Sequence, residues 1–324
     1  MVSLTREQFD RFDQDGWLVV DDVFHPEVDL DPVMAEYEQV LDRLATELRS
    51  DGTISDLYAG LPFGERLTRV YADAGTVFAQ NFDFSLPASA KENTPFWTGP
   101  AVFALLRHDG LLDAIESLIG PEIYSNPVQH VRLKPPEKLV PIDPKSGKPK
   151  LGATPWHQDN SVVTEDADRT ETITVWFPLV DVTAEMGSLQ VVPGSHRDGL
   201  LAHCPSKGPG GLHVPDRFFR PEDGVAVPMR RGSVLLMHRR TLHSSLPNSS
   251  DTVRFSLDLR YHPVGQPTGR SALPGFVARS RSRPETELRD PQRWTDLWLE
   301  ARRALAHGVT PRFNRWDPDS PVCA

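Results

Sequence analysis

The chain has 324 residues, of which 39% are hydrophobic and 25% charged, and its formal net charge at pH 7 is −10. The hydrophobic fraction suffices for a sizeable core, and the negative charge argues against general nucleic-acid binding, which requires a basic surface. The sequence contains no run of about 18 or more apolar residues and no signal-peptide pattern at its N-terminus, so we expect a cytoplasmic protein without a membrane span.

The N-terminal part of the sequence is predicted to be mainly helical. Thr5-Arg6-Glu7-Gln8 has the pattern of a capping box, in which both side chains satisfy backbone groups of the first turn. Gly16 is expected to end this helix, and the apolar run Trp17 to Val20 predicts a short strand. Further helices are expected from about Pro26 to Arg49, where one face is apolar, and from Leu111 to Ile119.

After Pro121 the sequence consists of short runs of β-branched and aromatic residues, separated by Pro, Gly, Asn and Asp. Many short strands at this spacing predict a sandwich or a barrel. The expected strands are Gln129 to Leu133, Thr172 to Val180, Ser188 to Val192, Ser233 to Met237 and Val253 to Tyr261. Segments rich in Pro and Gly predict loops at Pro135 to Pro155 and at Cys204 to Pro215.

No internal repeat or linker divides the sequence, so a single domain over residues 1–324 is expected. Its parts are a helical N-terminal part (about 1–120), a β core (about 121–263) and a C-terminal part (about 264–324) with a helix at about Pro291 to Ala306. The two cysteines, Cys204 and Cys323, are too few and too far apart to suggest a disulfide framework.

The segment Trp156-His157-Gln158-Asp159-Asn160 is the first candidate for chemistry. Residues two apart on an extended strand face the same side, so His157 and Asp159 can present an imidazole and a carboxylate to one point. Two His and one carboxylate form the facial ligand set of non-haem Fe(II) oxygenases. By itself this motif is weak evidence, because the chain has eleven His, and a polar His in a surface turn is an equally good interpretation.

The second candidate lies around His243 and Arg254. The residues between them favour a turn, which predicts a hairpin. If that turn is centred on Asn248-Ser249, His243 and Arg254 face each other across two strands, about 5 Å apart at Cβ. A cation beside a metal-binding His is unfavourable unless an anion lies between them, and arginine binds carboxylates in a bidentate manner. Taken alone, Arg254 could equally be a surface residue of an edge strand.

Together these motifs resemble the phytanoyl-CoA dioxygenase family of Fe(II)/2-oxoglutarate oxygenases. The resemblance covers most of the chain and rests on Phe12 to Val20, Trp156 to Asn160, the run Gly187 to His196, and Arg254. It implies a mainly β fold with added helices, in which a double-stranded β-helix (a cupin-like jelly roll) is flanked by N-terminal and C-terminal α-helices.

The resemblance also implies roles for individual residues. The expected iron ligands are His157, Asp159 and His243. The residues expected at the co-substrate are Arg254, which would hold the distal carboxylate of 2-oxoglutarate, together with Ser245, Gln158 and Trp176. The residues expected near the prime substrate are His130, Arg132 and Arg260. Arg260 is six residues beyond Arg254 and therefore on the same side of the strand, where neutralisation by Asp258 is the alternative. His203 and His213 are expected at the surface.

The implied activity is that of a dioxygenase that uses Fe(II), 2-oxoglutarate and O₂ to hydroxylate a small-molecule metabolite, with release of succinate and CO₂. The carboxylate of Asp159 argues against halogenation, because related halogenases have a small residue there that leaves room for chloride. The alternatives are a metal-binding β-barrel isomerase or hydrolase without redox chemistry, and an inactive small-molecule binding protein. Arg254 argues against the first alternative and the intact ligand set against the second.

The charge is unevenly distributed along the chain. Residues 1–60 contain fifteen Asp and Glu against four Lys and Arg, whereas residues 197–283 contain fourteen Lys and Arg against six Asp and Glu. One interpretation is that the basic region forms the mouth and lid of the pocket and favours an anionic substrate. The other is that its arginines are solvated and pair with the acidic N-terminal region.

Overall fold

A computed structural model describes residues 3–205, 211–317 and 319–323. Helix α1 (Arg6–Asp15) begins at the predicted capping box, in which Thr5 Oγ1 accepts from the Gln8 N–H and Gln8 Oε1 accepts from the Thr5 N–H. It ends at Gly16, whose φ of +78° is in the left-handed region that favours glycine. Strand β1 (Trp17–Val20) follows as predicted.

The other elements agree with the sequence in order, and several short ones are added. The remaining helices are α2 (Asp31–Ser50), which follows a short π-helix at Pro26–Leu30, α3 (Phe63–Ala74), α4 (Pro100–Leu106), α5 (Asp109–Ile119) and α6 (Pro291–His307). The remaining strands are β2 (Glu122–Ser125), β3 (His130–Lys134), β4 (Ile173–Pro178), β5 (Leu189–Val191), β6 (Cys204–Pro205), β7 (Leu212–His213), β8 (Val225–Val227), β9 (Val234–His238), β10 (His243–Ser245), β11 (Arg254–Pro263) and β12 (Phe276–Ser280).

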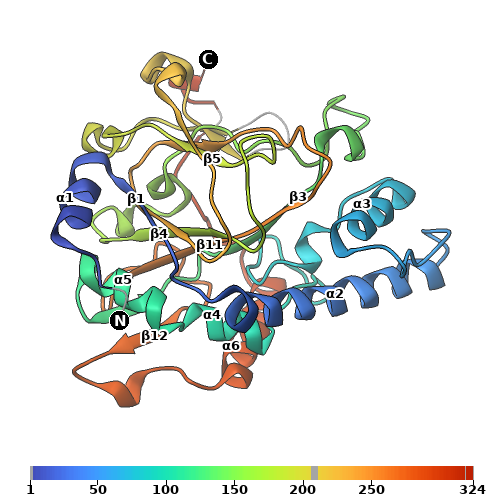
Figure 1. Ribbon diagram of the computed structural model, residues 1–324, viewed down its shortest axis with the longest axis horizontal. Helices are drawn as coiled ribbons and strands as arrows, with labels where there is room; N and C mark the ends of the chain where they lie inside the picture. The colour runs from blue at the N-terminus through green and yellow to red at the C-terminus, as the bar shows by residue number, and fades with distance from the viewer. Residues whose placement is uncertain (1–2, 206–210, 318, 324) are drawn as a thin grey trace.

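The strands form a large and a small antiparallel sheet, and β6 and β7 pair as a separate two-stranded sheet. The large sheet has the order β1-β9-β4-β11-β2-β12, and β3 also pairs with β11. The small sheet has the order β10-β5-β8. Helices α2, α4 and α6 lie on one side of the large sheet and β5 lies on the other (Figure 1). The expected mainly β fold with added helices is confirmed.

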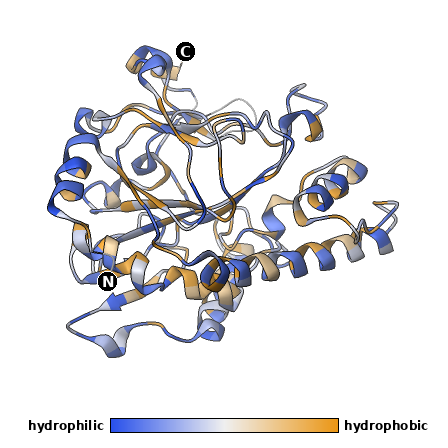
Figure 2. Cartoon of the chain, in the orientation of Figure 1, coloured by the Kyte–Doolittle hydropathy of each residue, from blue (hydrophilic) through white to orange (hydrophobic). Residues whose placement is uncertain are grey.

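Both faces of the large sheet are buried, and they belong to different cores. Side chains alternate between the two faces of a strand, so on β11 the apolar residues Phe255 and Leu257 face the helices, where Tyr37 of α2 packs edge-on against Phe255. A smaller core between the two sheets includes Trp176 of β4 and Met237 of β9. Helix α1 is largely hydrophilic, whereas hydrophobic residues concentrate on the strands and on the helices beneath them (Figure 2).

The C-terminal tail does not stay beside α6 but returns to the opposite end of the molecule (Figure 1). There Cys323 forms a disulfide with Cys204, with the two Cα atoms 5.5 Å apart although the residues are 119 positions apart in sequence. The number and spacing of the two cysteines did not suggest this disulfide, because separation along the chain says nothing about where a tail folds back. Among the described residues, no helix combines the length and hydrophobicity that crossing a bilayer requires.

Candidate metal centre and co-substrate pocket

His157, Asp159 and His243 come together, and the two histidines line one end of a cavity between the two sheets. His157 and His243 exchange two backbone hydrogen bonds of 2.9 and 3.0 Å. Gln158 has an extended backbone, so the residues on either side of it face the same way, as predicted. The Nε2 atoms of His157 and His243 lie 3.8 and 3.9 Å from the two carboxylate oxygens of Asp159, and one ligand atom from each residue lies within 4.8 Å of the others.

The hydrogen bonds of the two imidazoles prepare both rings to bind a cation. Nδ1 of His157 lies 2.9 Å from the carbonyl oxygen of Pro155, and Nδ1 of His243 lies 2.9 Å from that of Thr241. A carbonyl only accepts, so each Nδ1 carries the proton and each Nε2 keeps its lone pair. Burial, with the neighbouring His243, lowers the pKa of His157 to about 3 and keeps this ring neutral. The three residues therefore fit a divalent metal ion.

Asp159 is held in place by Arg260 and Thr174. The Arg260 guanidinium and the Thr174 hydroxyl each donate a hydrogen bond to a different oxygen of the Asp159 carboxylate. Burial alone would raise the pKa of Asp159, but Arg260 and the two histidines outweigh burial and hold the pKa below its usual value. Asp159 is thus ionised at neutral pH and cannot rotate freely.

Arg260 itself is not available to a substrate. It faces the interior as strand alternation predicted, but only 4% of its surface is exposed, and it also donates to the carbonyl oxygen of Val128. Asp258, the neutralising partner considered from the sequence, is 3.5 Å away, whereas Asp159 is the closer partner. The expectation that Arg260 contacts substrate is corrected by this pairing.

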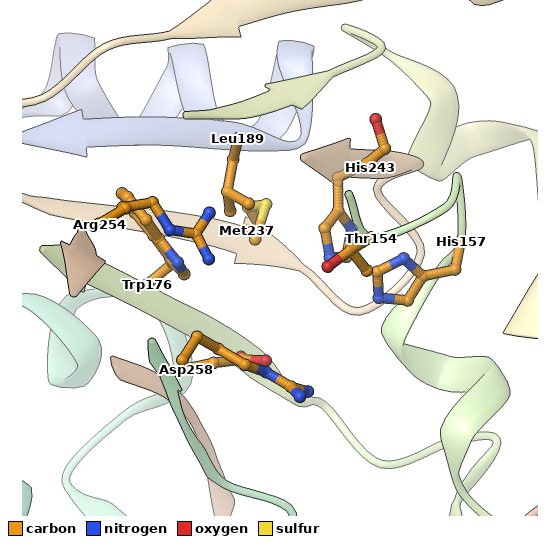
Figure 3. Close-up of a pocket in the computed structure, with 10 residues that line it drawn as sticks. Thr154, His157, Trp176, Leu189, Met237, His243, Arg254 and Asp258 are labelled. Carbon is orange, nitrogen blue, oxygen red and sulfur yellow. The ribbon is translucent and has the colours of Figure 1, made fainter. Parts of the chain in front are cut away.

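The predicted hairpin between His243 and Arg254 does not form. Strand β10, which carries His243, pairs with β5 in the small sheet, and β11 pairs with β3 and β4 in the large sheet. The cross-strand partner of Arg254 is Lys134. His243 and Arg254 still line one cavity, because the segment between them leads from one sheet to the sheet that faces it. Figure 3 places the two imidazoles side by side, and Arg254 with Trp176 away from them.

Arg254 and Lys134 are two buried cations on the far side from the metal ligands: Arg254 lines this cavity, and both line the cleft that adjoins it. Arg254 donates to the carbonyl oxygen of Gly187 at 2.8 Å, and its guanidinium carbon lies 5.6 Å from the centre of the Trp176 ring. Lys134 donates to Ser245 Oγ at 2.8 Å. Within the described residues neither cation has a carboxylate within 4 Å, which leaves their charges available to an anion.

The pKa values of both cations lie well below their usual values. Burial, with the neighbouring Arg254, lowers the pKa of Lys134 to about 7, and burial, with Arg132, lowers the pKa of Arg254 to about 9. A bound carboxylate would stabilise both charges. The sequence reasoning missed Lys134; the signal that could have found it is its position two residues beyond Arg132, on the same side of the strand.

Gln158 and His203 differ from what the sequence predicted. Gln158 is fully buried, but its amide turns away from the cavity to the carbonyl oxygens of Gly199 and Arg240. The alternation that brings its two neighbours together directs Gln158 to the opposite side, so its amide does not face the cavity as the resemblance implied. His203 is 1% exposed rather than at the surface, and its Nε2 accepts from the Gln158 N–H at 2.9 Å. Burial lowers the pKa of His203 to about 4.

The cavity opens into a cleft of about 590 Å³, which extends from His157 to Lys150 and to Leu212 in the predicted loop. Arg132 lines the cavity, this cleft and a neighbouring hollow that also includes Arg270. His130 lines the same hollow and is paired with Asp83 at 2.8 Å. Of the residues expected near the substrate, Arg132 is therefore the one whose charge faces open space.

Comparisons with known proteins agree with this geometry. Residues 12–256 match the family described as phytanoyl-CoA dioxygenase (PhyH). The 1-deoxypentalenic acid 11-beta-hydroxylase of Streptomyces arenae is 29% identical over 178 residues, covering 52% of this chain and 59% of the relative, so the match spans less than two thirds of that protein. The phytanoyl-CoA dioxygenase domain-containing protein 1 of Danio rerio is 26% identical over 78% of this chain and 88% of its own.

Two solved structures share the fold. The non-haem monooxygenase ThoJ in its apo form has a TM-score of 0.56 at 21% identity, over 92% of this chain and 97% of ThoJ. EvdO2 from Micromonospora carbonacea var. aurantiaca has a TM-score of 0.53 at 21% identity, over 82% of this chain and 95% of EvdO2. At 21% sequence identity, these two structures show a shared fold and no more.

Proposed function

The chain belongs to the phytanoyl-CoA dioxygenase family, and from that premise we propose that it is an Fe(II)- and 2-oxoglutarate-dependent dioxygenase that hydroxylates a small molecule, with release of succinate and CO₂. One observation carries the proposal. The cavity lined by the imidazoles of the His157, Asp159 and His243 cluster is also lined by Arg254, and the cleft into which it opens is lined by His157, Arg254 and Lys134. A dicarboxylate that chelates a metal with one end needs such a cationic partner for its other end.

Each group in the cavity has a task under this proposal. His157, Asp159 and His243 would hold the iron, which, when bound with 2-oxoglutarate, supplies the oxidative chemistry. Arg254 and Lys134 would bind the distal carboxylate of 2-oxoglutarate, and Ser245 keeps the Lys134 ammonium beside it by accepting its hydrogen bond.

The remaining walls orient these groups and restrict water. Arg260 and Thr174 fix the carboxylate of Asp159, so that its oxygens are directed before a metal arrives. Trp176, Leu189 and Met237 form an apolar wall between the two ends of the cavity. Such a wall keeps bulk water from a reactive centre and strengthens the charged contacts at both ends.

A metal-dependent isomerase or hydrolase is the weaker alternative. Such an enzyme needs the ligand set but has no use for two neighbouring buried cations that, among the described residues, have no carboxylate partner. Burying Arg254 and Lys134 disfavours their charged forms, an arrangement that an anionic co-substrate would explain. The name of the Streptomyces relative, a hydroxylase, supports the same choice.

We also propose that the prime substrate is an anion. The charge count along the sequence does not support this by itself, because Arg230 and Arg231 of the basic region pair with Asp21 and Asp31 of the acidic one. The support comes from Arg132, which lines the cavity, the cleft and the neighbouring hollow. Among the described residues, Arg132 has no acidic partner within 4 Å. Clefts with walls of one charge raise the local concentration of the opposite charge.

The experiment for the activity uses the purified chain loaded with Fe(II) under anaerobic conditions. Addition of 2-oxoglutarate should produce the visible charge-transfer absorption of a metal-bound 2-oxo acid, and admission of O₂ should yield succinate even without a prime substrate. His243→Ala should lose both signals. Metal binding without either signal in the unaltered chain would favour the isomerase or hydrolase alternative.

The experiment for the substrate class compares a panel of carboxylic acids with the corresponding neutral amides. We expect acids, and not amides, to accelerate succinate formation. Arg132→Gln should abolish this preference, while Arg220→Gln should not, because Arg220 is exposed and paired with Glu222 at 3.1 Å. Equal stimulation by acids and amides would refute the anionic substrate and leave the oxygenase proposal intact.

A further inference from the structure

The C-terminal tail packs on the loop that carries two of the proposed metal ligands. Trp316 Nε1 donates to the carbonyl oxygen of Ser161 at 2.9 Å, two residues beyond Asp159. Arg315 forms an ion pair with Asp168 at 2.6 Å. Asp168 in turn accepts from the side chain of Asn160 at 3.1 Å. The tail therefore contacts this loop beside Asp159 and at its far end.

His203 links the tail to the centre of the ligand motif. Its ring lies 5.1 Å from that of Trp316, centre to centre, and its Nε2 accepts from the backbone N–H of Gln158, the residue between His157 and Asp159. The other ring nitrogen of His203 is hydrogen-bonded to the carbonyl oxygen of Leu201. The ring is thereby fixed on three sides, and a shift of the tail would release one of them.

A covalent bond closes this arrangement at the residue after His203. Cys204 is joined to Cys323, seven residues beyond Trp316. We propose that this disulfide is a redox-sensitive latch: when closed, it holds Trp316 and Arg315 against the ligand loop and positions His157 and Asp159, and when reduced, it releases the tail and weakens metal binding. The inference rests on the proposed function only through the assignment of the three metal ligands.

The exposure of the two sulfurs indicates how the latch would open. Cys204 is 2% exposed, whereas Cys323 is half-buried. A thiolate of an external dithiol would attack Sγ of Cys323, and Cys204 would leave as a thiolate and take up a proton. The second thiol of the dithiol then displaces Cys323, so the latch gains two electrons and two protons while the dithiol becomes a disulfide.

The physical reason for the coupling is effective concentration. With the disulfide closed, the tail is tethered at both ends and its contacts form within one molecule at little entropic cost. Once the disulfide opens, the segment after α6 loses this covalent tether and must order itself to make the same contacts. Because no tail residue belongs to the ligand set itself, the latch changes how strongly the metal is held and leaves the donor atoms the same.

The test measures the affinity of the chain for Co(II), an iron substitute that does not require anaerobic turnover. The oxidised chain is compared with chain reduced by dithiothreitol and freed of reductant by anaerobic gel filtration, and with the double variant Cys204→Ser/Cys323→Ser. Changes around metal ligands typically weaken binding by 10- to 100-fold, so we expect about tenfold weaker binding for the reduced chain and for the double variant. The double variant should not respond to dithiothreitol.

Two further measurements separate positioning from general loss of structure. Amide hydrogen exchange of residues 157–168 should accelerate on reduction, while exchange in β9 and β11 stays unchanged. Trp316→Phe keeps the ring but loses the donor to Ser161, and it should weaken Co(II) binding in the oxidised chain by a smaller factor. Equal Co(II) affinity in the oxidised and reduced chains would overturn the latch alone. Failure of the oxidised chain to bind Co(II), with no difference from His243→Ala, would overturn the metal assignment as well.

Discussion

The two faces of strand β11 are equally buried and serve different purposes. Phe255, Leu257 and Leu259 face the helices and belong to the main core. The residues that alternate with them along the strand face the other way, and they include Arg254 and Arg260. Exposure does not distinguish the faces, since both arginines are less than 5% exposed. What distinguishes them is whether a buried group is satisfied by packing or by a specific polar partner.

Strand β3, which pairs with β11, also has one apolar and one polar face. Val131 and Leu133 join the main core, whereas His130 lines the neighbouring hollow and Arg132 and Lys134 line the cleft. In both strands the apolar side chains hold the sheet against the helices. The polar side chains on the opposite face are positioned by that packing. We therefore expect substitutions on the helix side to lower the free energy of unfolding and to leave ligand binding unchanged. Substitutions on the cleft side should weaken the binding of metal or 2-oxoglutarate and leave stability nearly unchanged.

The largest effect is expected on the cleft side, from His243→Ala. Loss of one of three ligands should weaken metal binding by more than about 100-fold, beyond what changes in the surrounding shell cause, and turnover should be lost with the metal. The melting temperature of the metal-free protein should change little. Retention of metal-dependent turnover in this variant would end the assignment of His243 and reopen the search among the remaining histidines.

On the helix side, Phe255→Ala should lower the free energy of unfolding by about 3–5 kcal/mol, because it removes a buried ring packed against Tyr37 and Phe63. Urea denaturation measures this loss. The folded fraction should bind metal with unchanged affinity, and Leu257→Met, which keeps the volume, should cost less than about 1.5 kcal/mol. A stable Phe255→Ala protein with impaired metal binding would contradict the separation of the two faces.

Arg254→Ala should weaken the binding of 2-oxoglutarate by about 2–5 kcal/mol, the usual loss when one partner of a buried charged pair is removed. Arg254→Lys should recover part of this binding free energy, because the positive charge is kept. Recovery should be incomplete, because an ammonium cannot reproduce the planar fork of a guanidinium. Titration of the metal-loaded protein with 2-oxoglutarate gives both values. The assignment fails if the dissociation constant for 2-oxoglutarate is unchanged while that of a prime substrate rises.

The smallest effect is a pH dependence that arises from Lys134. Its pKa is lowered to about 7 by burial and by Arg254, and a bound carboxylate favours the charged form, so binding takes up a proton above that pH. The affinity for 2-oxoglutarate should therefore be constant below pH 7 and fall by up to about tenfold per unit above it. Lys134→Met should bind less tightly and show no such slope between pH 7 and 8.5. An identical slope in Lys134→Met would assign the titration to another group.

Local patterns in the sequence predicted much of this structure. The capping box at Thr5 and the alternation in Val253 to Tyr261 depend on residues a few positions apart, and both occur as expected. The convergence of His157 and Asp159 follows from the same alternation. These features share a physical basis, which is that backbone geometry over two to four residues determines them.

Features that depend on distant parts of the chain were not predictable in the same way. The pairing of β10 with β5 replaced the hairpin expected from local turn residues. The contacts of Arg260 and His203 with the ligand motif join residues 101 and 45 positions apart. Lys134 was not predicted as a site residue, because lysine is almost never buried without a partner. Its place beside the cleft follows from the pairing of distant strands.

The length of β11 has a consequence for how the chain can vary. Arg254 and Arg260 are six residues apart, which at about 3.3 Å per residue spans about 20 Å. One end of this span is fixed at Gly187 and the other at Asp159. A single inserted or deleted residue between the arginines would turn one of them toward the helices. Substitutions within the strand can be accommodated one at a time, but a change of length cannot, so descendants of this sequence should vary in composition here while preserving its length.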